Sequence, residues 1–233
     1  MKIKKLWRHR WILRAIVPSI IFNFRHLPFK QARFLPILLY KPRLGECSGN
    51  FVFKCPVRFG LVKLGKNCVS IYPDSGISIE NRGTIIFNGR LTIGNASAIS
   101  VGREGTLEFG NSVTVTTCLK LVCYHCVSIQ DNVLIGWNCM ITDTDFHKLK
   151  YIDGGYSKGY GNIIIQNDTW IANGCKLYKN TNIPSYCVIS SDTIIRGSID
   201  CSPYSLIVTE STATVRKEGV FRDKNDDMIN YLQ

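Results

Sequence analysis

Aliphatic residues recur at every sixth position over a long part of this 233-residue chain. They are Ile165, Ile171, Leu177, Ile183, Ile189 and Ile195, and Ile129, Ile135 and Ile141 keep the same step upstream. Four residues after each of the first five stands a small residue: Thr169, Cys175, Thr181, Cys187 and Thr193. One short strand and one turn fill six residues, so three such units make a triangular coil of about 18 residues. The repeat therefore predicts stacked coils of parallel strands and disfavours a doubly wound sheet or a sandwich.

Short extended segments also precede this repeat, at a looser spacing that indicates insertions in the early turns. They are Phe51–Phe53, Leu61–Leu64, Ile77–Ile79, Thr84–Phe87, Leu91–Ile93, Ala98–Val101, Thr106–Phe109 and Val113–Val115. Glycine or asparagine separates them, which is typical of all-β structure. We expect a β-helix domain over residues 44–215. An N-terminal arm (1–43) precedes it, and a C-terminal extension (216–233) follows it, with a short helix near Met228–Leu232.

The positive charge of the chain is concentrated in the N-terminal arm. Residues 1–43 hold 11 Lys and Arg and no acid, whereas the other residues hold 18 basic and 17 acidic side chains. The apolar segment Trp11–Phe24 is too short to span a bilayer and resembles no standard signal peptide. Two interpretations stay open: a helix lying in an anionic membrane interface, or a helix packed on the end of the domain. Nucleic acid is disfavoured because no binding motif accompanies the charge.

Ten cysteines occur in the chain, and their positions argue against a disulfide framework. Cys139, Cys175 and Cys187 stand at small-residue positions of the repeat, where a free thiol packs like a small hydrophobe. We therefore expect reduced thiols in a cytoplasm. The Cys123-Tyr-His-Cys126 segment, with Cys118 nearby, is a weak metal signal because it lacks a second pair, and we predict no metal site.

The repeat is interrupted once, at Thr142-Asp-Thr-Asp-Phe-His147. Of the four histidines, His147 alone lies on this break; the others are His9, His26 and His125. Residues 148–164 then add four glycines and the aromatic residues Tyr151, Tyr156 and Tyr160, too much for a tight corner. Long loops in compact folds are often functional. We expect this loop, 142–164, to protrude from the scaffold.

The interrupted repeat resembles the hexapeptide-repeat acyltransferases. The similarity rests on Ile129-Gln-Asp-Asn-Val-Leu-Ile-Gly136, on Ile165-Gln-Asn-Asp-Thr-Trp-Ile-Ala172, and on the Asp143-to-His147 break with Trp170 after it. It covers about residues 60–217 and is nearest to bacterial polysaccharide and sugar O-acetyltransferases. The resemblance implies a left-handed parallel β-helix, a homotrimer, and acetyl-CoA in a groove between subunits.

The same resemblance assigns roles to residues around the break. His147 is the expected general base that removes a proton from the acceptor hydroxyl, because imidazole titrates near working pH. Asp143, Asp145 and His147 alternate, so in an extended segment all three point to one side. Asp145, as the nearer acid, is expected to orient the imidazole, although either acid can instead cap the turn. Trp170 is expected to pack near the histidine or to belong to an interface, and the loop tyrosines to face a sugar.

The expected donor-binding residues come by position from the resemblance alone. They are Asn173, Ser191, Arg196, Arg216 and Lys217, of which the basic ones suit the phosphates of CoA. The chain departs from the family pattern at Ser190–Thr193 and Thr209–Thr214, where relatives carry glycines and a proline. These departures put the detailed CoA contacts, and acetyl as the transferred group, in question.

The sequence therefore predicts a bacterial cytoplasmic O-acetyltransferase of polysaccharide biosynthesis. Its acceptor is a hydroxyl of a cell-surface glycan or lipid-linked sugar at the inner face of the membrane. Two alternatives stay open: N-acylation of a nucleotide-linked amino sugar, and a catalytically inactive trimeric scaffold. Zinc chemistry of the carbonic anhydrase type needs three histidine ligands, and the repeat region holds two histidines.

Overall fold

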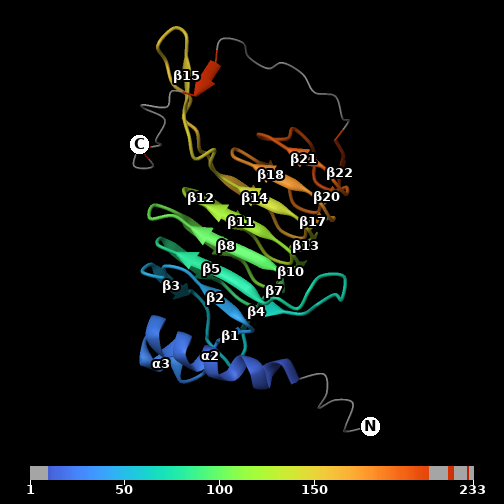
Figure 1. The fold of residues 1–233 in the computed structure, drawn as a ribbon. Coiled ribbons are helices and arrows are strands. Elements are labelled where there is room, and N and C mark those ends of the chain that lie inside the picture. Colours follow the sequence, from blue (N-terminus) through green and yellow to red (C-terminus); the bar gives the residue numbers. More distant parts are fainter. Residues whose placement is uncertain (1–9, 210–219, 223–229, 231–233) are drawn as a thin grey trace.

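Parallel strands stacked in register make up most of the molecule (Figure 1). The computed structural model describes residues 10–209, 220–222 and 230. Its helices are α2 (Arg10–His26) and α3 (Phe29–Ala32), and its strands are β1 (Ile37–Leu39), β2 (Pro42–Leu44), β3 (Asn50–Phe53), β4 (Val62–Lys66), β5 (Ile77–Asn81), β6 (Thr84–Phe87), β7 (Leu91–Gly94), β8 (Ser97–Val101), β9 (Thr106–Phe109), β10 (Val113–Thr117), β11 (Lys120–Cys123), β12 (Cys126–Ile129), β13 (Leu134–Trp137), β14 (Met140–Thr142), β15 (Leu149–Tyr151), β16 (Ile163–Ile165), β17 (Trp170–Ile171), β18 (Lys176–Tyr178), β19 (Asn182–Ile183), β20 (Val188–Ile189), β21 (Ile194–Ile195), β22 (Leu206–Ile207) and β23 (Val220–Arg222).

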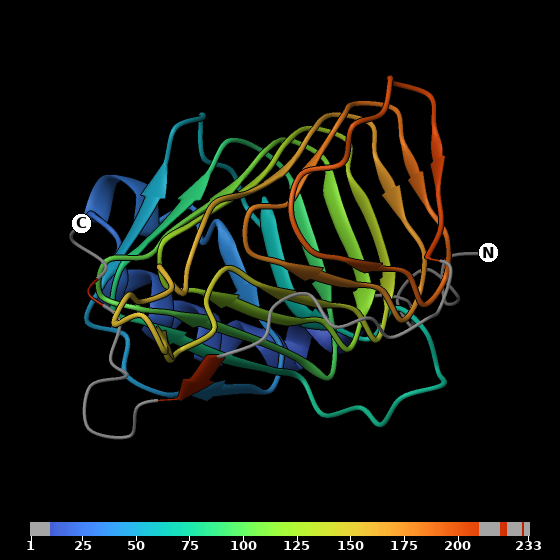
Figure 2. The ribbon, with the colours of Figure 1, turned by 90° about the horizontal axis from the view of Figure 1, so that it is seen from above.

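Three sheets form the walls of a triangular prism. Sheet A has the order β1-β4-β7-β10-β13-β17-β20-β22, sheet B the order β2-β5-β8-β11-β14-β18-β21, and sheet C the order β19-β16-β12-β9-β6-β3. The chain visits A, B and C in turn, so three successive strands make one coil. Figure 2, seen from above, shows the coils lying over one another. The predicted left-handed parallel β-helix is confirmed.

The aliphatic sixth positions form three ladders inside the prism. Ile135, Ile171 and Ile189 pair in sheet A, Ile141, Leu177 and Ile195 in sheet B, and Ile129, Ile165 and Ile183 in sheet C. All nine belong to the buried core. Residues that share a ladder place in neighbouring regular coils are 18 apart, as from Ile171 to Ile189. The repeat thus places one apolar side chain per wall in every coil.

The corners of the prism explain the small residues of the repeat. A residue with positive φ precedes each of them: Asp168, Gly174, Asn180, Tyr186 and Asp192 come before Thr169, Cys175, Thr181, Cys187 and Thr193. Asn, Asp and Gly tolerate this left-handed backbone best. The small side chain that follows is buried at the turn. All ten cysteines are free thiols.

Helix α2 covers the end of the stack at the first coil (Figure 1). Strand β1 is the edge of sheet A, and its backbone groups find partners on the helix. Asn23 Nδ2 donates to Ile37 O at 2.7 Å, the Ile37 amide donates to Asn23 Oδ1 at 3.2 Å, and the Leu39 amide donates to Ser19 Oγ at 2.8 Å. Phe22 joins the same core. A covered edge cannot recruit another strand.

The β-helix begins inside the segment expected as an arm. Strands β1 and β2 pair with β4 and β5, so the expected boundary at residue 43 falls within the first coil. The part of the arm from residue 10 onward packs on the domain end. Among the described residues, no helix is long and apolar enough to cross a bilayer. The expected C-terminal helix lies outside the described residues apart from Asn230.

Loop 142–164, which interrupts the repeat, leaves the stack after β14 (Figure 1). Ile141 pairs with Leu177, 36 positions later (177 − 141), so this coil holds 18 residues more than a regular one. The loop folds back on itself through bridges between Lys150 and Tyr156 and between Thr144 and Tyr160. Strand β15 in this loop also pairs antiparallel with β23. The predicted protrusion of loop 142–164 is therefore observed.

Candidate active site

The corner between sheets B and C, here the B–C corner, carries the base of loop 142–164. In the coil below it, Leu121 and Ile129 are eight positions apart instead of six, which leaves two extra residues, Tyr124 and His125, in the turn. Asp143 from the coil above lies over this turn and is fully buried. Its carboxylate accepts hydrogen bonds from the amides of Tyr124 at 2.8 Å and His125 at 2.7 Å. The buried carboxylate of Asp143 thereby joins two coils.

Burial raises the pKa of the Asp143 carboxyl. The backbone N–H groups that donate to it favour the ionised form and partly oppose this rise. Its oxygens are committed to the backbone of the neighbouring turn. Of the two uses that the sequence left open for the acids of this loop, the structure gives Asp143 the turn-fixing one.

The segment from Asp143 to His147 is not extended, so the expected alternation on one side does not hold. Phe146 has a φ of +63°, in the left-handed region, and its amide donates to Thr144 Oγ1 at 3.0 Å. The ring of Phe146 packs edge-on against that of Tyr124, with centroids 5.1 Å apart. This kink turns the chain between Asp145 and His147.

Asp145 is exposed and forms an ion pair with Lys179 from the next coil. Directly above, the guanidinium of Arg196 lies over the ring of Tyr178 at 4.2 Å from its centroid. Two basic side chains, Lys179 and Arg196, therefore reach the B–C corner beside the loop. Lys179 is not evident from the sequence, because the 18 extra residues of this coil hide the register that pairs Thr142 with Tyr178 and so brings Lys179 to the base of the loop.

His147 is half-buried and follows β14, at the B–C corner. Trp170 lies on β17 in sheet A, between Leu134 and Val188 in register, and is 50% exposed. In a triangular coil the B–C corner faces away from sheet A. At about 3.3 Å per residue, a wall of five residues puts the two side chains on the order of 15 Å apart across the prism. One chain does not bring His147 and Trp170 together.

The expected donor-binding residues are also divided within one chain. Asn173 and Ser191 meet at the corner between sheets A and B, where Ser191 Oγ donates to Asn173 Oδ1 at 2.9 Å. Arg196 lies at the B–C corner instead. Arg216 and Lys217 lie outside the described residues.

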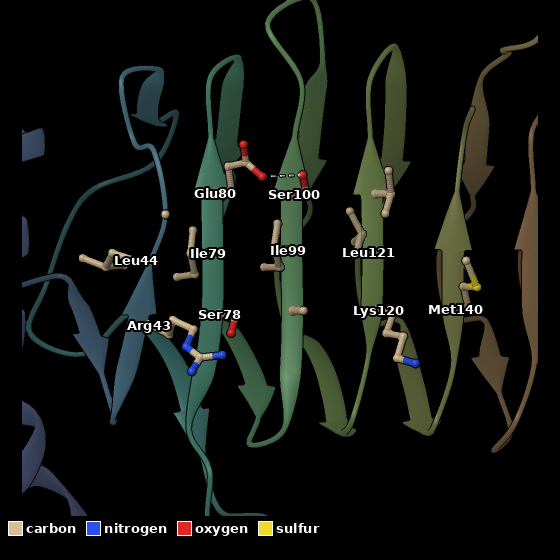
Figure 3. A pocket seen from close by; sticks show the side chains of 13 residues that line it. Arg43, Leu44, Ser78, Ile79, Glu80, Ile99, Ser100, Lys120, Leu121 and Met140 are labelled. Carbon is tan, nitrogen blue, oxygen red and sulfur yellow. Dashed lines mark hydrogen bonds between the residues drawn. The ribbon is translucent and has the colours of Figure 1, made fainter. Parts of the chain in front are cut away.

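A shallow groove of about 630 Å³ runs across the outer face of sheet B (Figure 3). Its floor is mostly apolar or small, with Leu44, Ala98, Val122 and Met140 lining it and Lys120 at one side. Met140 belongs to β14, so the groove ends where loop 142–164 begins. Sheet A carries a second outward apolar patch, formed by Leu134, Trp170 and Leu206, which are all exposed.

A smaller polar pocket of about 310 Å³ lies at the base of loop 142–164, on the side of sheet C. His125, Lys158, Asn162, Asn180 and Asn182 contribute polar groups to it. Tyr160 is 3% exposed and packs edge-on against His125, so its ring is not available to stack on a sugar as expected. Tyr156 is exposed, with the ammonium of Lys148 at 4.2 Å from its ring centroid.

Cys123 and Cys126 lie near this corner, and among the residues that the structure describes no group of three or more His, Cys, Asp or Glu side chains is placed to hold a metal ion. Burial raises the pKa of the Cys123 thiol and of the Cys126 thiol. Burial therefore disfavours the thiolate form of both groups.

Comparison with known proteins gives one relative by sequence. No family model matches the chain. A probable acetyltransferase of Mycobacterium tuberculosis, Rv3034c, is 31% identical over 129 residues, which are 53% of this chain and 41% of that protein. The chain thus matches less than half of the relative's length.

One solved structure also aligns, that of the polysialic acid O-acetyltransferase OatWY. It covers 78% of this chain and 80% of its own, with 15% identity and a TM-score of 0.33. At that TM-score it carries no argument about this chain. The hexapeptide repeat, the β-helix that it forms and the mycobacterial relative confirm the resemblance to the hexapeptide-repeat acyltransferases.

Proposed function

We propose that this protein transfers an acetyl group from acetyl-CoA to a hydroxyl of a cell-surface polysaccharide or lipid-linked sugar, with His147 as general base. The observation that carries the proposal is the placement of His147. It stands on an excursion that adds 18 residues to its coil, and the base of that excursion is fixed by Asp143, by Phe146 on Tyr124, and by the Asp145–Lys179 pair. The probable acetyltransferase activity of the mycobacterial relative supports the reaction class.

In this mechanism the imidazole of His147 takes the proton of the acceptor hydroxyl as its oxygen attacks the thioester carbonyl. The tetrahedral intermediate then collapses and expels the CoA thiolate, which takes the proton back from the imidazolium. Asp145 is exposed and paired with Lys179, so we assign it to positioning the loop.

Acetyl-CoA carries several phosphates, and the B–C corner offers cationic side chains for them. Lys179 and Arg196 lie next to the loop that carries His147, and Arg196 is held over the ring of Tyr178. Charge-assisted bonds from such groups to phosphate are the stronger kind. We assign Lys179 to the donor site together with Arg196; Asn173 and Ser191 would join it from another copy.

A homotrimer would complete the site. Ring assemblies use two different patches of each chain, and the patches must be complementary. The exposed patch around Trp170 on sheet A and the groove on sheet B are such a pair of apolar surfaces. Docking of one on the other would bring Trp170 of a second copy toward the B–C corner of the first.

The test is acetyl transfer from acetyl-CoA to a panel of acceptors: de-O-acetylated polysaccharide, lipid-linked oligosaccharide and a nucleotide-linked amino sugar. Release of free CoA and the mass gain of the acceptor are both recorded. His147→Ala is expected to lower kcat about 100- to 10,000-fold, the usual worth of a general base. His125→Ala is the matched control at the same corner and should keep the activity within a few-fold.

Full activity in His147→Ala would exclude the base assignment. Transfer to the amino sugar alone would favour N-acylation. Absence of acetyl-CoA binding by calorimetry would favour the inactive scaffold.

A further inference from the structure

Helix α2 has two apolar faces, and one of them packs against the first coil of the β-helix. Ala15, Ser19, Phe22 and Asn23 are buried against the first coil. Leu13, Val17, Ile20, Ile21 and Phe24 recur at the helical spacing of 0, 4, 7, 8 and 11 and point the opposite way. All five are exposed, Leu13 to 76% and Ile21 to 62%. A surface helix usually carries polar residues on this outer face.

The exposed stripe continues beyond the end of α2. Phe29 of α3 is 70% exposed, and its ring lies 6.0 Å from that of Phe24. Phe34 follows, also exposed, with the guanidinium of Arg33 over its ring. The end of the prism is therefore a continuous apolar surface, larger than scattered single exposed residues would make.

Basic side chains border this surface. Arg14 and Arg25 lie along one edge of the α2 stripe at helical positions of about 100° and 120° from Leu13. Lys30 and Arg33 lie on and after α3, and all four are exposed. Residues 1–43 contain no acidic side chain at all. An apolar centre with a basic border matches the interface of a membrane that contains anionic lipid.

We propose that the outer surface of α2 and α3 binds an anionic lipid bilayer, with α2 lying in the plane of the interface. The charge pattern decides between this occupant and a second copy of the chain. Two copies joined end to end would bring two basic borders together, and like charges repel. A lipid surface complements both the apolar stripe and its border.

The height of the catalytic loop above that surface follows from the stack. In sheet B, four strand spacings separate β2, in the first coil, from β14, which leads into the loop. At about 4.8 Å per spacing, plus a helix about 10 Å thick, His147 would stand roughly 30 Å above the bilayer. This step rests on the proposed function. The height favours a lipid-linked acceptor whose reacting sugar is far from its lipid, and it disfavours a sugar attached directly to the lipid.

The binding test uses the full chain and sedimentation with vesicles of phosphatidylcholine, with and without phosphatidylglycerol. We expect the wild type to bind the anionic vesicles and to dissociate as salt is added. The double substitution Ile21→Ser, Phe24→Ser should weaken binding about 100-fold or more, from the lost burial of two large apolar side chains. Arg25→Gln with Lys30→Gln should weaken it about 25-fold, near fivefold per charge.

Ile152→Ser is the control, because Ile152 is an exposed apolar side chain on loop 142–164, far from α2. Equal circular dichroism spectra and melting temperatures establish that the variants fold. Failure of the wild type to bind anionic vesicles, or equal binding by the Ile21/Phe24 variant, would overturn the proposal. Loss of self-association in that variant, measured by light scattering, would assign the surface to a second copy instead.

Vesicle binding is measured without acetyl transfer, so it can succeed or fail independently of the proposed function. Transfer to lipid-linked acceptors of increasing length then tests the height. Transfer that rises with acceptor length would support it, and equal transfer at every length would refute it. No transfer to any acceptor would count against the proposed function alone.

Discussion

The B–C corner and the outer face of sheet A are positioned by different means. At the corner, a kinked loop is fixed by the buried carboxylate of Asp143, by an aromatic contact and by an ion pair between coils. On sheet A, Trp170 is placed by strand register alone, one step above Leu134. The regular repeat provides a surface, whereas the departure from it provides the chemical groups. The two regions face away from each other, so a site that uses both needs two chains.

Subunit mixing gives the largest expected effect on this comparison. Chains carrying His147→Ala and chains carrying Trp170→Ala, each weakly active alone, are unfolded together, mixed equally and refolded. If each site combines His147 of one chain with Trp170 of another, about a quarter of the sites in random trimers regain both residues. Acetyl transfer measured before and after mixing gives the answer. No recovery, with trimers demonstrated by light scattering, would place both residues in a site of one chain or remove Trp170 from it.

The two acids of the loop should differ in what they stabilise. Asp143→Ala leaves the half-buried amides of Tyr124 and His125 without their side-chain acceptor, and we expect a loss of about 2–4 kcal/mol in unfolding free energy. Asp145→Ala removes an exposed ion pair and should cost less than about 1 kcal/mol. Urea unfolding of both variants measures the difference. Equal losses would mean that the corner is not held by Asp143.

The basic residues at the corner should affect the donor more than the acceptor. Lys179→Gln and Arg196→Gln are each expected to raise the KM for acetyl-CoA about 5- to 30-fold, from the loss of one charge-assisted bond to phosphate. The KM for the acceptor should stay within about twofold. Lys176→Gln, an exposed residue at the other end of β18, is the control. The reverse pattern would assign these cations to an anionic acceptor.

The smallest expected effect is on the pH dependence of stability. Burial raises the pKa of Asp143 above its usual value of 3.8, so the folded state holds its proton where the unfolded state has lost it. Titration of Asp143 therefore lowers the unfolding free energy as pH rises from about 4 toward the higher folded pKa. In Asp143→Asn that decline should disappear from urea unfolding series collected between pH 3.5 and 7. An unchanged slope would show that another group titrates in this range.

The sequence predicted the walls of the prism better than its corners. Ile135, Ile171 and Ile189 could be placed because a strict period depends only on local strand geometry. The kink at Phe146 and the pairing of Lys179 with Asp145 depend on contacts with neighbouring coils, to Tyr124 in one case and to Lys179 in the other. The alternation of Asp143, Asp145 and His147 suggested an extended segment, but the amides of the turn below draw Asp143 inward.

For the N-terminal helix the sequence left two interpretations open, a membrane-interface helix and a helix packed on the domain. In the structure one face of α2 packs on the domain, and the opposite face is apolar and exposed. Ser19 and Asn23 are polar residues within an apolar run, and in a membrane helix they would have no evident role. Their use in closing the edge of β1 depends on where the first coil begins, which the loose early spacing did not reveal.

The strands become shorter along the stack, and this difference should decide which coils open first on unfolding. Strands β5, β8 and β10 each have five residues, whereas β17 and β19 to β22 each have two. In a structure whose units bond only to their neighbours, the units with the fewest bonds open first. The coils that carry Trp170 and Arg196 are among these. Mild heating should therefore abolish catalysis while the end closed by α2 still protects its backbone amides from hydrogen exchange.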